Sequence, residues 1–408
     1  MLLVAALAPF VVLATSVAAN PKATRNPHIS LSITKHVNGN GTSSLPLRDQ
    51  KRSMNLVKDC RQSEITDVPL NDSAIAYSVN IDVGDPPTNY NLMIDTGSAN
   101  TWLGANKPYK KTKTSVKTSD VLNVTYSAGL GFAHGIEYED TVIIAPGVAI
   151  RQSIGVASNS SGIYPYDGVL GLSPKYWSIG MLSPDNTSAI PTVTDNLYGQ
   201  GKIEQNLVAV SFEPTTSAPV INGELTFGGT DSTKYTGDIT YFPLTVTETT
   251  PANKYWAIEA SFRYGNASAT ILNTTAGIVD TGTPLIGLAT DAYNRYVDVT
   301  GAVYDEKAGL LRITPAQYKN LQSLFFDIGG KTYELTPNAQ IWPRALNTLM
   351  GGETNSIYLV LFDLGPKISK EMGFIAGMPF LERYYCVFDT GNSRVGLATT
   401  PFTYADIN

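Results

Sequence analysis

Apolar and polar residues alternate in short runs through most of this chain. A period of two is visible in residues 75–84 (IAYSVNIDVG) and 223–229 (GELTFGG), and Gly, Pro, Asn and Asp separate such runs from about residue 74 onward. Because alternate side chains of a strand point to opposite faces, this pattern predicts strands. Helical periodicity is limited to residues 190–203, 290–301 and 314–324, where Thr314 and Pro315 suit a helix start. We therefore expect a mainly β fold.

One motif occurs twice in matching surroundings. The segment LMIDTGSANTWLGA, with Asp95, returns 185 residues later as GIVDTGTPLIGLAT, with Asp280. An apolar segment containing a glycine follows each copy, around Gly171 and Gly377, 76 and 97 residues downstream. A period this long indicates two related lobes rather than a solenoid. The 408 residues suffice for two lobes, which we expect at 64–235 and 236–408.

The first nineteen residues carry no charge and end in Val17-Ala18-Ala19. This is typical of a secretory signal peptide cut before Asn20, and a membrane anchor is the alternative. Because no second apolar run of spanning length follows and the C-terminus is polar, we expect a secreted, extracellular protein without a membrane anchor. Seven Asn-x-Ser/Thr sequons agree with secretion. They are Asn40 and, as N-glycosylation candidates of the main body, Asn71, Asn123, Asn159, Asn186, Asn266 and Asn273.

Charge is divided unevenly along the chain. Residues 20–63 hold eight Lys or Arg against two Asp, a net charge of +6, whereas residues 64–408 hold 21 basic and 33 acidic residues, a net charge of −12. A basic arm could bind nucleic acid or an anionic membrane. In a secreted protein we favour an intramolecular role, a basic pro-peptide that lies on its acidic body and detaches when carboxylates protonate. The pro-peptide could be cut at Lys51-Arg52 or by self-cleavage near Glu64.

Residues for other hydrolytic chemistries are scarce. Of three histidines only His134 lies outside the expected pro-peptide, and no spacing typical of a metal site or a phosphate loop occurs. We expect no metal and no cofactor. Of the two cysteines, Cys386 lies in an apolar run that favours a buried, inert thiol, and its pairing with Cys60 stays open. Hydrolysis would therefore depend on carboxylates.

The two Asp-Thr-Gly copies have the features that hydrolysis by a pair of carboxylates needs. Asp95 and Asp280 each follow an apolar strand, and the glycine two residues later permits close approach of the backbone. Ser98 or Thr283 can donate to the preceding carboxylate. If the lobes bring the two carboxyls together, the pair shares one proton, and it can take a proton from water while giving one to a carbonyl. We expect Asp95 and Asp280 to be catalytic, supported by Thr96, Gly97, Ser98, Thr281, Gly282 and Thr283.

At this point the chain resembles the pepsin-like aspartic proteases over residues 64–408. The resemblance rests on NLMIDTGSANTWLGA, YDGVLGLSP, GELTFGGTDSTKYTGDI, AGIVDTGTPLIGL and FIAGMPFLERYYCVFDTGNSRVGLA. Within the family, QSIGVAS, SFEPTTS and NAQIWPRALNT are most similar to the polyporopepsin-type enzymes secreted by basidiomycete fungi. The resemblance implies a bilobal β fold with a cleft between the lobes and a β-hairpin flap over the cleft.

The resemblance also implies roles around the cleft. Tyr126 matches the flap tyrosine and Trp102 the tryptophan behind it, although the altered segment VTYSAGLG leaves a register with Ala128 in that place open. Tyr166 and Val169 match residues of the first apolar subsite, with core packing as the alternative. Pro284 stands where the family commonly has a small hydroxyl residue, and its ring removes a backbone donor.

We predict a secreted aspartic endopeptidase, made as a zymogen, that hydrolyses proteins at acid pH and prefers bulky apolar residues around the cut. Its expected partners are extended polypeptide substrates and its own pro-peptide as an intramolecular inhibitor; we expect no nucleic acid partner and a monomer. The alternatives are an inactive binding or inhibitory protein of the same fold, suggested by the altered flap and Pro284, and a carboxylate-pair glycosidase.

A third Asp-Thr-Gly copy lies at Asp389. Asn392 replaces the hydroxyl residue three positions on, and no apolar segment with a matching glycine follows. Apolar runs on both sides are what a tight hairpin needs, with Asp, Gly and Asn as turn residues. We expect Asp389 to form a turn.

Overall fold

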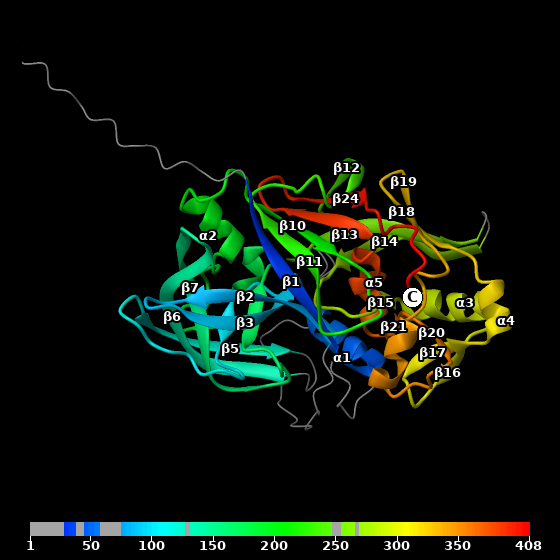
Figure 1. The fold of residues 1–408 in the computed structure, drawn as a ribbon, viewed down its shortest axis with the longest axis horizontal. Coiled ribbons are helices and arrows are strands. Elements are labelled where there is room, and N and C mark those ends of the chain that lie inside the picture. Colours follow the sequence, from blue (N-terminus) through cyan, green and yellow to red (C-terminus); the bar gives the residue numbers. More distant parts are fainter. Residues whose placement is uncertain (1–27, 38–44, 58–74, 127–130, 247–253, 266–268) are drawn as a thin grey trace, which may run out of the picture.

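The computed structural model of the chain describes residues 28–37, 45–57, 75–126, 131–246, 254–265 and 269–408. Two lobes lie side by side, with β5, β6 and β7 in one and α3 and α4 in the other (Figure 1). The strands of the described residues form three sheets, of 14, seven and three strands. The mainly β, bilobal fold predicted from the sequence is confirmed.

The first lobe contains the strands at one end of the 14-stranded sheet, in the order β2-β3-β8-β4-β7-β6-β5-β9. Strand β6 shows why the sequence forms this sheet, since buried and more exposed residues alternate along nearly all of its length. The strands are β2 (Ile75–Val83), β3 (Thr88–Asp95), β4 (Trp102–Leu103), β5 (Val116–Tyr126), β6 (Gly131–Ala145), β7 (Val148–Ser161), β8 (Gly168–Gly171) and β9 (Leu182–Ser183); the helices are η1 (Lys175–Ser178) and α2 (Val193–Gly199).

The second lobe has a seven-stranded sheet, in the order β19-β18-β13-β14-β22-β15-β21, and a three-stranded sheet, β16-β17-β20. Its strands are β13 (Ala257–Tyr264), β14 (Ala269–Val279), β15 (Ile286–Leu288), β16 (Val303–Asp305), β17 (Leu310–Ile313), β18 (Leu324–Ile328), β19 (Lys331–Leu335), β20 (Ile357–Leu359), β21 (Leu361–Asp363) and β22 (Phe374–Ala376). Its helices are α3 (Thr290–Thr300), α4 (Pro315–Lys319), η3 (Arg344–Met350), η4 (Ile368–Lys370) and α5 (Met378–Leu381).

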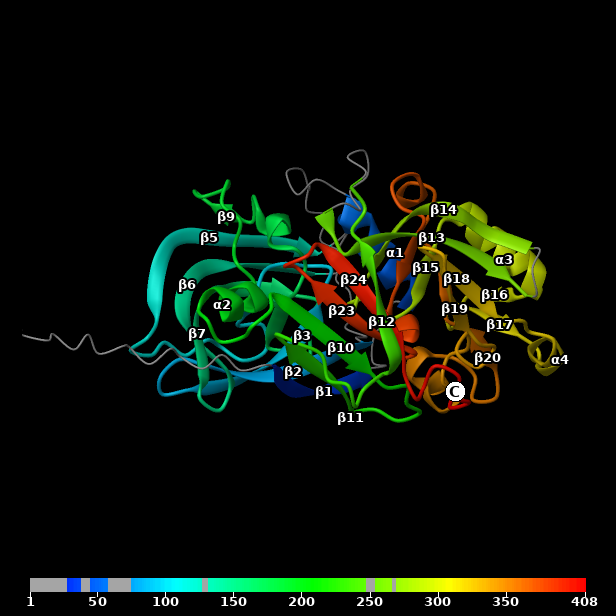
Figure 2. The same ribbon diagram turned by 90° about the horizontal axis from the view of Figure 1, so that it is seen from above.

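Strands from both parts of the sequence form the rest of the 14-stranded sheet, so the lobes share a common base (Figure 2). They are β1 (Ile29–Val37), β10 (Leu207–Phe212), β11 (Val220–Phe227), β12 (Thr236–Pro243), β23 (Tyr384–Asp389) and β24 (Arg394–Thr399). Every residue of β10 and β23 is buried, which indicates that this part of the sheet is covered on both faces.

The three helices expected from periodicity are present as α2, α3 and α4. The start of α4 and the end of α3 are set by residues at those positions in the sequence. Thr314 caps α4 by accepting from the backbone N–H of Gln317, with Pro315 in the first turn. Helix α3 stops at Gly301, whose φ of 63° is the left-handed conformation that glycine adopts without strain.

The third Asp-Thr-Gly copy joins β23 to β24 in an antiparallel hairpin, as predicted. Asp389 is buried and accepts hydrogen bonds from the backbone N–H of Asn392 at 3.1 Å and from Nε of Arg394 at 2.7 Å. These contacts hold the turn together within the hairpin. Asp389 is therefore a structural residue.

Two elements that the sequence analysis did not identify lie in the basic segment. Strand β1 (Ile29–Val37) pairs antiparallel with β11 and with β2, inside the shared sheet. Helix α1 (Leu45–Val57) contacts β21 of the second lobe. Lys35, at the end of β1, forms a buried ion pair with Glu382, which also accepts from the hydroxyl of Tyr77 at 3.0 Å. The basic segment is thus built into the fold rather than held only at the surface.

Candidate active site

The repeated motif forms the same local structure in both lobes. Strand β3 ends at Asp95 and runs parallel to β8, with Asp95 opposite Gly171. Strand β14 ends just before Asp280 and runs parallel to β22, with Val279 opposite Ala376. In each lobe a short strand after the motif, β4 or β15, pairs antiparallel with β8 or β22. The duplicated pattern seen in the sequence is therefore a duplicated strand arrangement.

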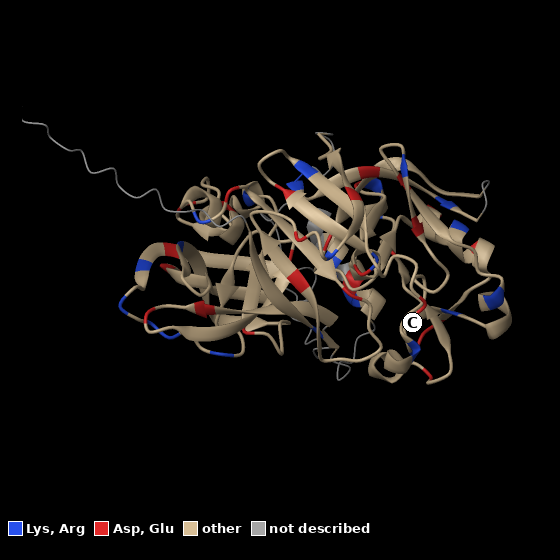
Figure 3. Cartoon of the chain, turned by 45° about the horizontal axis from the view of Figure 1, so that its top comes forward, with Lys and Arg blue, Asp and Glu red and all other residues tan. Residues whose placement is uncertain are grey.

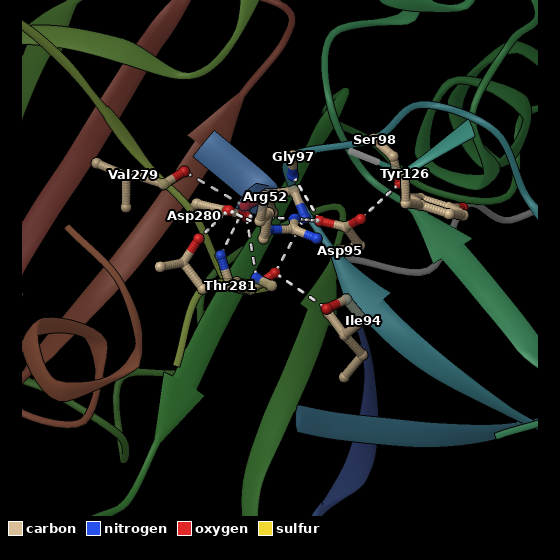
Figure 4. Close-up of polar contacts among 12 residues, drawn as sticks. Arg52, Ile94, Asp95, Gly97, Ser98, Tyr126, Val279, Asp280 and Thr281 are labelled. Atoms are coloured by element: carbon tan, nitrogen blue, oxygen red, sulfur yellow. Dashed lines mark hydrogen bonds and ion pairs between the residues drawn. The ribbon is translucent and has the colours of Figure 1, made fainter. Parts of the chain in front are cut away.

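Asp95 and Asp280 meet at the junction of the lobes, and both side chains are fully buried (Figure 4). Each carboxyl accepts one side-chain and one backbone hydrogen bond from its own loop. Ser98 donates to Asp95 at 2.7 Å and Thr283 to Asp280 at 2.6 Å. The N–H groups of Gly97 and Gly282 donate at 2.8 and 2.9 Å. These contacts hold both carboxyls in place, and at Asp95 they favour the charged form.

The two threonines of the motifs tie the lobes together behind the carboxyls. The hydroxyl of Thr281 accepts from the backbone N–H of Thr96 at 3.0 Å, and the hydroxyl of Thr96 accepts from the N–H of Thr281 at 2.9 Å. Each hydroxyl also donates across the junction, to the carbonyls of Ile94 and Val279. Because the contacts are reciprocal, moving one loop would break bonds to the other.

Glycine is required where the loops approach. A Cβ atom on Gly282 would lie 2.6 Å from Oδ1 of Asp95, and one on Gly97 would lie 3.0 Å from Oδ1 of Asp280. Any larger residue would therefore push the opposite carboxyl away. This explains the third position of the Asp-Thr-Gly motif in steric terms.

Arg52 of α1 lies between the two carboxyls (Figure 4). One terminal nitrogen donates to Oδ1 of Asp95 at 2.6 Å, and Nε donates to Oδ2 of Asp280 at 3.1 Å. The arginine side chain is 14% exposed and the aspartates 1% or less. The basic segment thus occupies the site, and acidic and basic residues meet between the lobes (Figure 3). The uneven charge predicted a contact between the basic segment and the acidic body, but the sequence named Arg52 only as part of a possible cleavage site and not as a partner of the two aspartates.

The electrostatics of the site follow from burial and from these charges. Burial raises the pKa of Asp95, the Arg52 guanidinium lowers it in part, and the carboxylate of Asp280 raises it further. Burial disfavours the charge of Arg52, but Asp280 and Asp95 outweigh that effect and raise its pKa. Arg52 therefore remains a cation at any pH at which the protein is folded.

A second carboxyl of α1 is buried beside the same site. Asp49 is 3% exposed, and its Oδ2 has no hydrogen-bond partner among the described residues. Burial raises its pKa to about 8, although Arg48 and Arg52 lower it. Asp49 lines a cavity of about 50 Å³ together with Arg48, Arg52, Met93 and Tyr166. At neutral pH this carboxyl is held largely in its protonated form.

Tyr126 and Trp102 lie together as the flap assignment requires. The indole Nε1 of Trp102 donates to the hydroxyl of Tyr126 at 2.5 Å. Tyr126 is the last residue of β5 and pairs with Gly131 of β6. Burial raises the pKa of its hydroxyl, as does the charge of Asp95. Ala128, the alternative register, lies outside the described residues.

The two subsite candidates differ in their positions. Tyr166 is buried but lines the cavity next to α1. Val169 is fully buried in β8 opposite Met93 and does not line that cavity. Pro284 lines it from the second lobe. The geometry therefore favours Tyr166 over Val169 as a contact for a ligand.

The remaining sequence-based candidates lie away from the dyad. Cys386 is fully buried in β23, and burial raises the pKa of its thiol; Cys60 lies outside the described residues. Asn123, Asn159, Asn186 and Asn273 are exposed, whereas Asn40, Asn71 and Asn266 lie outside the described residues. Among the described residues, no group of three or more His, Cys, Asp or Glu could hold a metal ion, and no helix is long and apolar enough to cross a membrane.

Comparison with known proteins adds three findings. A sequence model of the eukaryotic aspartyl protease family matches residues 76–400. The chain is 57% identical over 341 residues to polyporopepsin of Irpex lacteus, covering 84% of this chain and 99% of the relative, and 29% identical to pepsin A of Suncus murinus, covering 82% and 84%. The crystal structure of the aspartic proteinase from Irpex lacteus superposes with a TM-score of 0.80 at 52% identity, covering 93% of this chain and all of that one.

Proposed function

Because the chain belongs to the eukaryotic aspartyl protease family, it is an aspartic endopeptidase, and we propose that Asp95 and Asp280 are its catalytic dyad. The single observation that carries this assignment is the convergence of the two carboxyls, from two duplicated loops, on one side chain of the chain itself. A group that spans both carboxyls occupies the place that a water molecule would take in the open enzyme. Asp389 of the third copy pairs instead with Arg394 of its own hairpin.

In the proposed reaction one carboxyl of the pair is protonated and the other ionised. The ionised carboxylate takes a proton from water as the water oxygen attacks the peptide carbonyl carbon. The protonated carboxyl gives its proton to the carbonyl oxygen, which forms a tetrahedral diol. Proton transfer to the leaving nitrogen then breaks the C–N bond. Ser98 and Thr283 hold the carboxyls, so little reorganisation is needed between these steps.

The proposed substrates are extended polypeptides with bulky apolar residues around the cut. Met93, Ile163 and Tyr166 give the cavity next to the dyad an apolar wall. The hairpin β5–β6, with Tyr126 at the end of its first strand, would close over the substrate as a flap. Main-chain hydrogen bonds would supply affinity, and side-chain pockets would supply selectivity.

We further propose that the chain is made as a secreted zymogen. In this scheme residues 1–19 are a signal peptide, 20–63 a pro-peptide, and 64–235 and 236–408 the lobes of the mature enzyme. Arg52 supports the scheme because it donates to both aspartates, so a substrate would have to displace it to reach the dyad. The buried pair of Lys35 and Glu382 supports it as a second attachment of the same segment.

The proposed activation by acid follows from linkage. In the closed form the pKa of Asp95 is raised, first by burial and also by the charge of Asp280, while Arg52 lowers it in part. Because the ion pair between Arg52 and Asp95 needs an ionised carboxylate, protonation of Asp95 at falling pH weakens this contact of the closed form. Arg52 is part of α1 and is largely buried, so cleavage after Lys51-Arg52 requires that α1 detach first. Self-cleavage near Glu64 falls outside the described residues.

The full-length chain tests this function. After transfer to about pH 4, we expect it to shorten itself and to cleave a denatured protein, and Asp280→Asn to do neither. Asp389→Asn is the matched control, since it makes the same change in the same tripeptide and should leave both activities intact. Activity retained by Asp280→Asn would refute the dyad. A folded wild-type chain without any activity would instead favour a binding protein of this fold.

A further inference from the structure

Two sequons that lie far apart in the sequence are neighbours in the structure. Asn123 of β5 is directly opposite His134 of β6, and His134 is directly opposite Asn159 of β7. Residues opposite one another in adjacent strands point to the same face. Strands lie about 4.8 Å apart, so the two asparagines stand about 10 Å apart with one strand between them. Both are exposed.

The hydroxyl residues at the third position of the two sequons lie in the next row of the same face. Thr125 is opposite Phe132, and Phe132 is opposite Ser161. Both hydroxyl residues are exposed and Phe132 is half-buried, with its ring against the edge of His134 at a centroid distance of 4.9 Å. Each complete sequon is therefore presented on one open surface of β5, β6 and β7.

This face is turned away from the substrate side of the hairpin. Along β5, Leu122 and Val124 are buried and share a face with Tyr126, whereas Asn123 and Thr125 point the other way. A large group on Asn123 therefore lies opposite the residue that contacts the dyad region. It would not enter the cleft.

Apolar side chains surround the two asparagines on this outer face. Val121 is 49% exposed and lies opposite Ile136, which is opposite Val156. Ile136 and Val156 are half-buried, as is Phe132 on the other side of the asparagines. Val121 is exposed, and Ile136 and Val156 pack against the core with part of their surface still accessible, so a group laid over them would remove apolar surface from water.

We propose that Asn123 and Asn159 both carry N-linked glycans, which together cover this outer face of the β5–β6–β7 sheet. The inference rests on the proposed secretion, because the donor is a lipid-linked oligosaccharide pyrophosphate of the secretory route. In each transfer the side-chain amide nitrogen bonds to C1 of the first sugar, and the bond from C1 to the pyrophosphate oxygen breaks. The lipid pyrophosphate leaves with the electron pair, and the amide loses one proton.

The test uses the full chain secreted from a eukaryotic host. Glycopeptide mass analysis is made on wild type, Asn123→Gln, Asn159→Gln and the double variant, before and after enzymatic removal of N-glycans. We expect each single change to lose one glycan and the double to lose two. Ser161→Ala should lose the glycan of Asn159 although that asparagine is kept. The double variant should bind more of an apolar fluorescent dye, with unchanged kcat/KM on a short peptide.

Asn186→Gln is the matched control, because Asn186 is an exposed sequon outside this sheet face. It should leave both glycans and the dye binding unchanged. A secreted wild-type chain in which either asparagine carries no glycan overturns the proposal, and unchanged dye binding in the double variant overturns the covering role. A chain that cleaves no protein refutes the proposed enzyme instead, and the glycan masses are still read on that chain.

Discussion

Replacing Arg52 by Gln should open the closed form. The change removes the cation that contacts both carboxyls, which are 1% exposed or less, at distances of 2.6 and 3.1 Å. Breaking a buried ion pair by removing one partner costs about 3–5 kcal/mol, because the remaining charge stays buried. In the open form Arg52 is in water, so the change has little effect there. At about 1.4 kcal/mol per factor of ten, the lower figure shifts the closed–open equilibrium roughly a hundredfold.

The assay is the affinity of the unprocessed chain for a peptide inhibitor that mimics the tetrahedral intermediate, measured near neutral pH. An inhibitor that binds only the open form has its apparent affinity reduced by the fraction open. Arg52→Gln should therefore bind it roughly a hundredfold more tightly than wild type. Arg151→Gln is the control, since its pair with Glu139 is about half exposed and such pairs contribute at most about 1 kcal/mol.

The reasoning is refuted if Arg52→Gln binds the inhibitor within about threefold of wild type while its thermal unfolding shows a folded chain. That result would mean that other contacts of the basic segment keep the site closed. Tighter binding by Arg151→Gln to the same degree would point to a general effect of lost positive charge.

Three further predictions concern the same segment and the flap. Asp49→Asn should slow acid opening. The carboxyl of Asp49 has a pKa of about 8 when α1 is docked, so between its ordinary pKa and pH 8 the docking of α1 must take up a proton, at a free-energy cost that grows as the pH rises. Asparagine needs no proton and removes this cost, which stabilises the closed form. The lag before self-shortening at about pH 5 measures it, and an equal or shorter lag contradicts it. Lys35→Met should leave Glu382 buried without its cation and lower the unfolding temperature of the unprocessed chain. The mature enzyme, which lacks Lys35 under the proposed processing, should not be affected, and equal losses in both forms would show that Lys35 is not confined to the pro-peptide. Trp102→Phe should remove the hydrogen bond to Tyr126 and lower kcat/KM on a peptide by about tenfold, which corresponds to the free energy of one hydrogen bond. Unchanged kinetics would show that this contact does not position the flap.

Much of the site could be predicted from the sequence because its determinants are local. Asp95 and Asp280 stood out by their neighbours: an apolar strand before, a glycine two positions on and a hydroxyl three positions on. Asp389 lacked the hydroxyl and was correctly assigned to a turn. The cap of α4 at Thr314 could be predicted for the same reason, since its side chain accepts a hydrogen bond from a backbone group three residues away.

Arg52 illustrates what local pattern does not reveal. It is one of eight basic residues in its segment, and α1 has no sequence feature that points to the dyad. Its partners lie 43 and 228 residues away, so only the packing of α1 between the lobes selects it. Asp49 is similar, because its exposure depends on what covers the helix and not on its neighbours.

The sequence by itself therefore determined the β class, the duplication, the two aspartates and the charge division between segment and body. These follow from periodicity, steric demands at single residues and composition, which act over a few positions. Only the tertiary structure decided which cation enters the dyad, which subsite candidate faces the cavity, and that Asn123 and Asn159 share one row across β6. Such facts depend on strand register and on contacts between distant segments, where a shift of one residue turns every side chain to the opposite face.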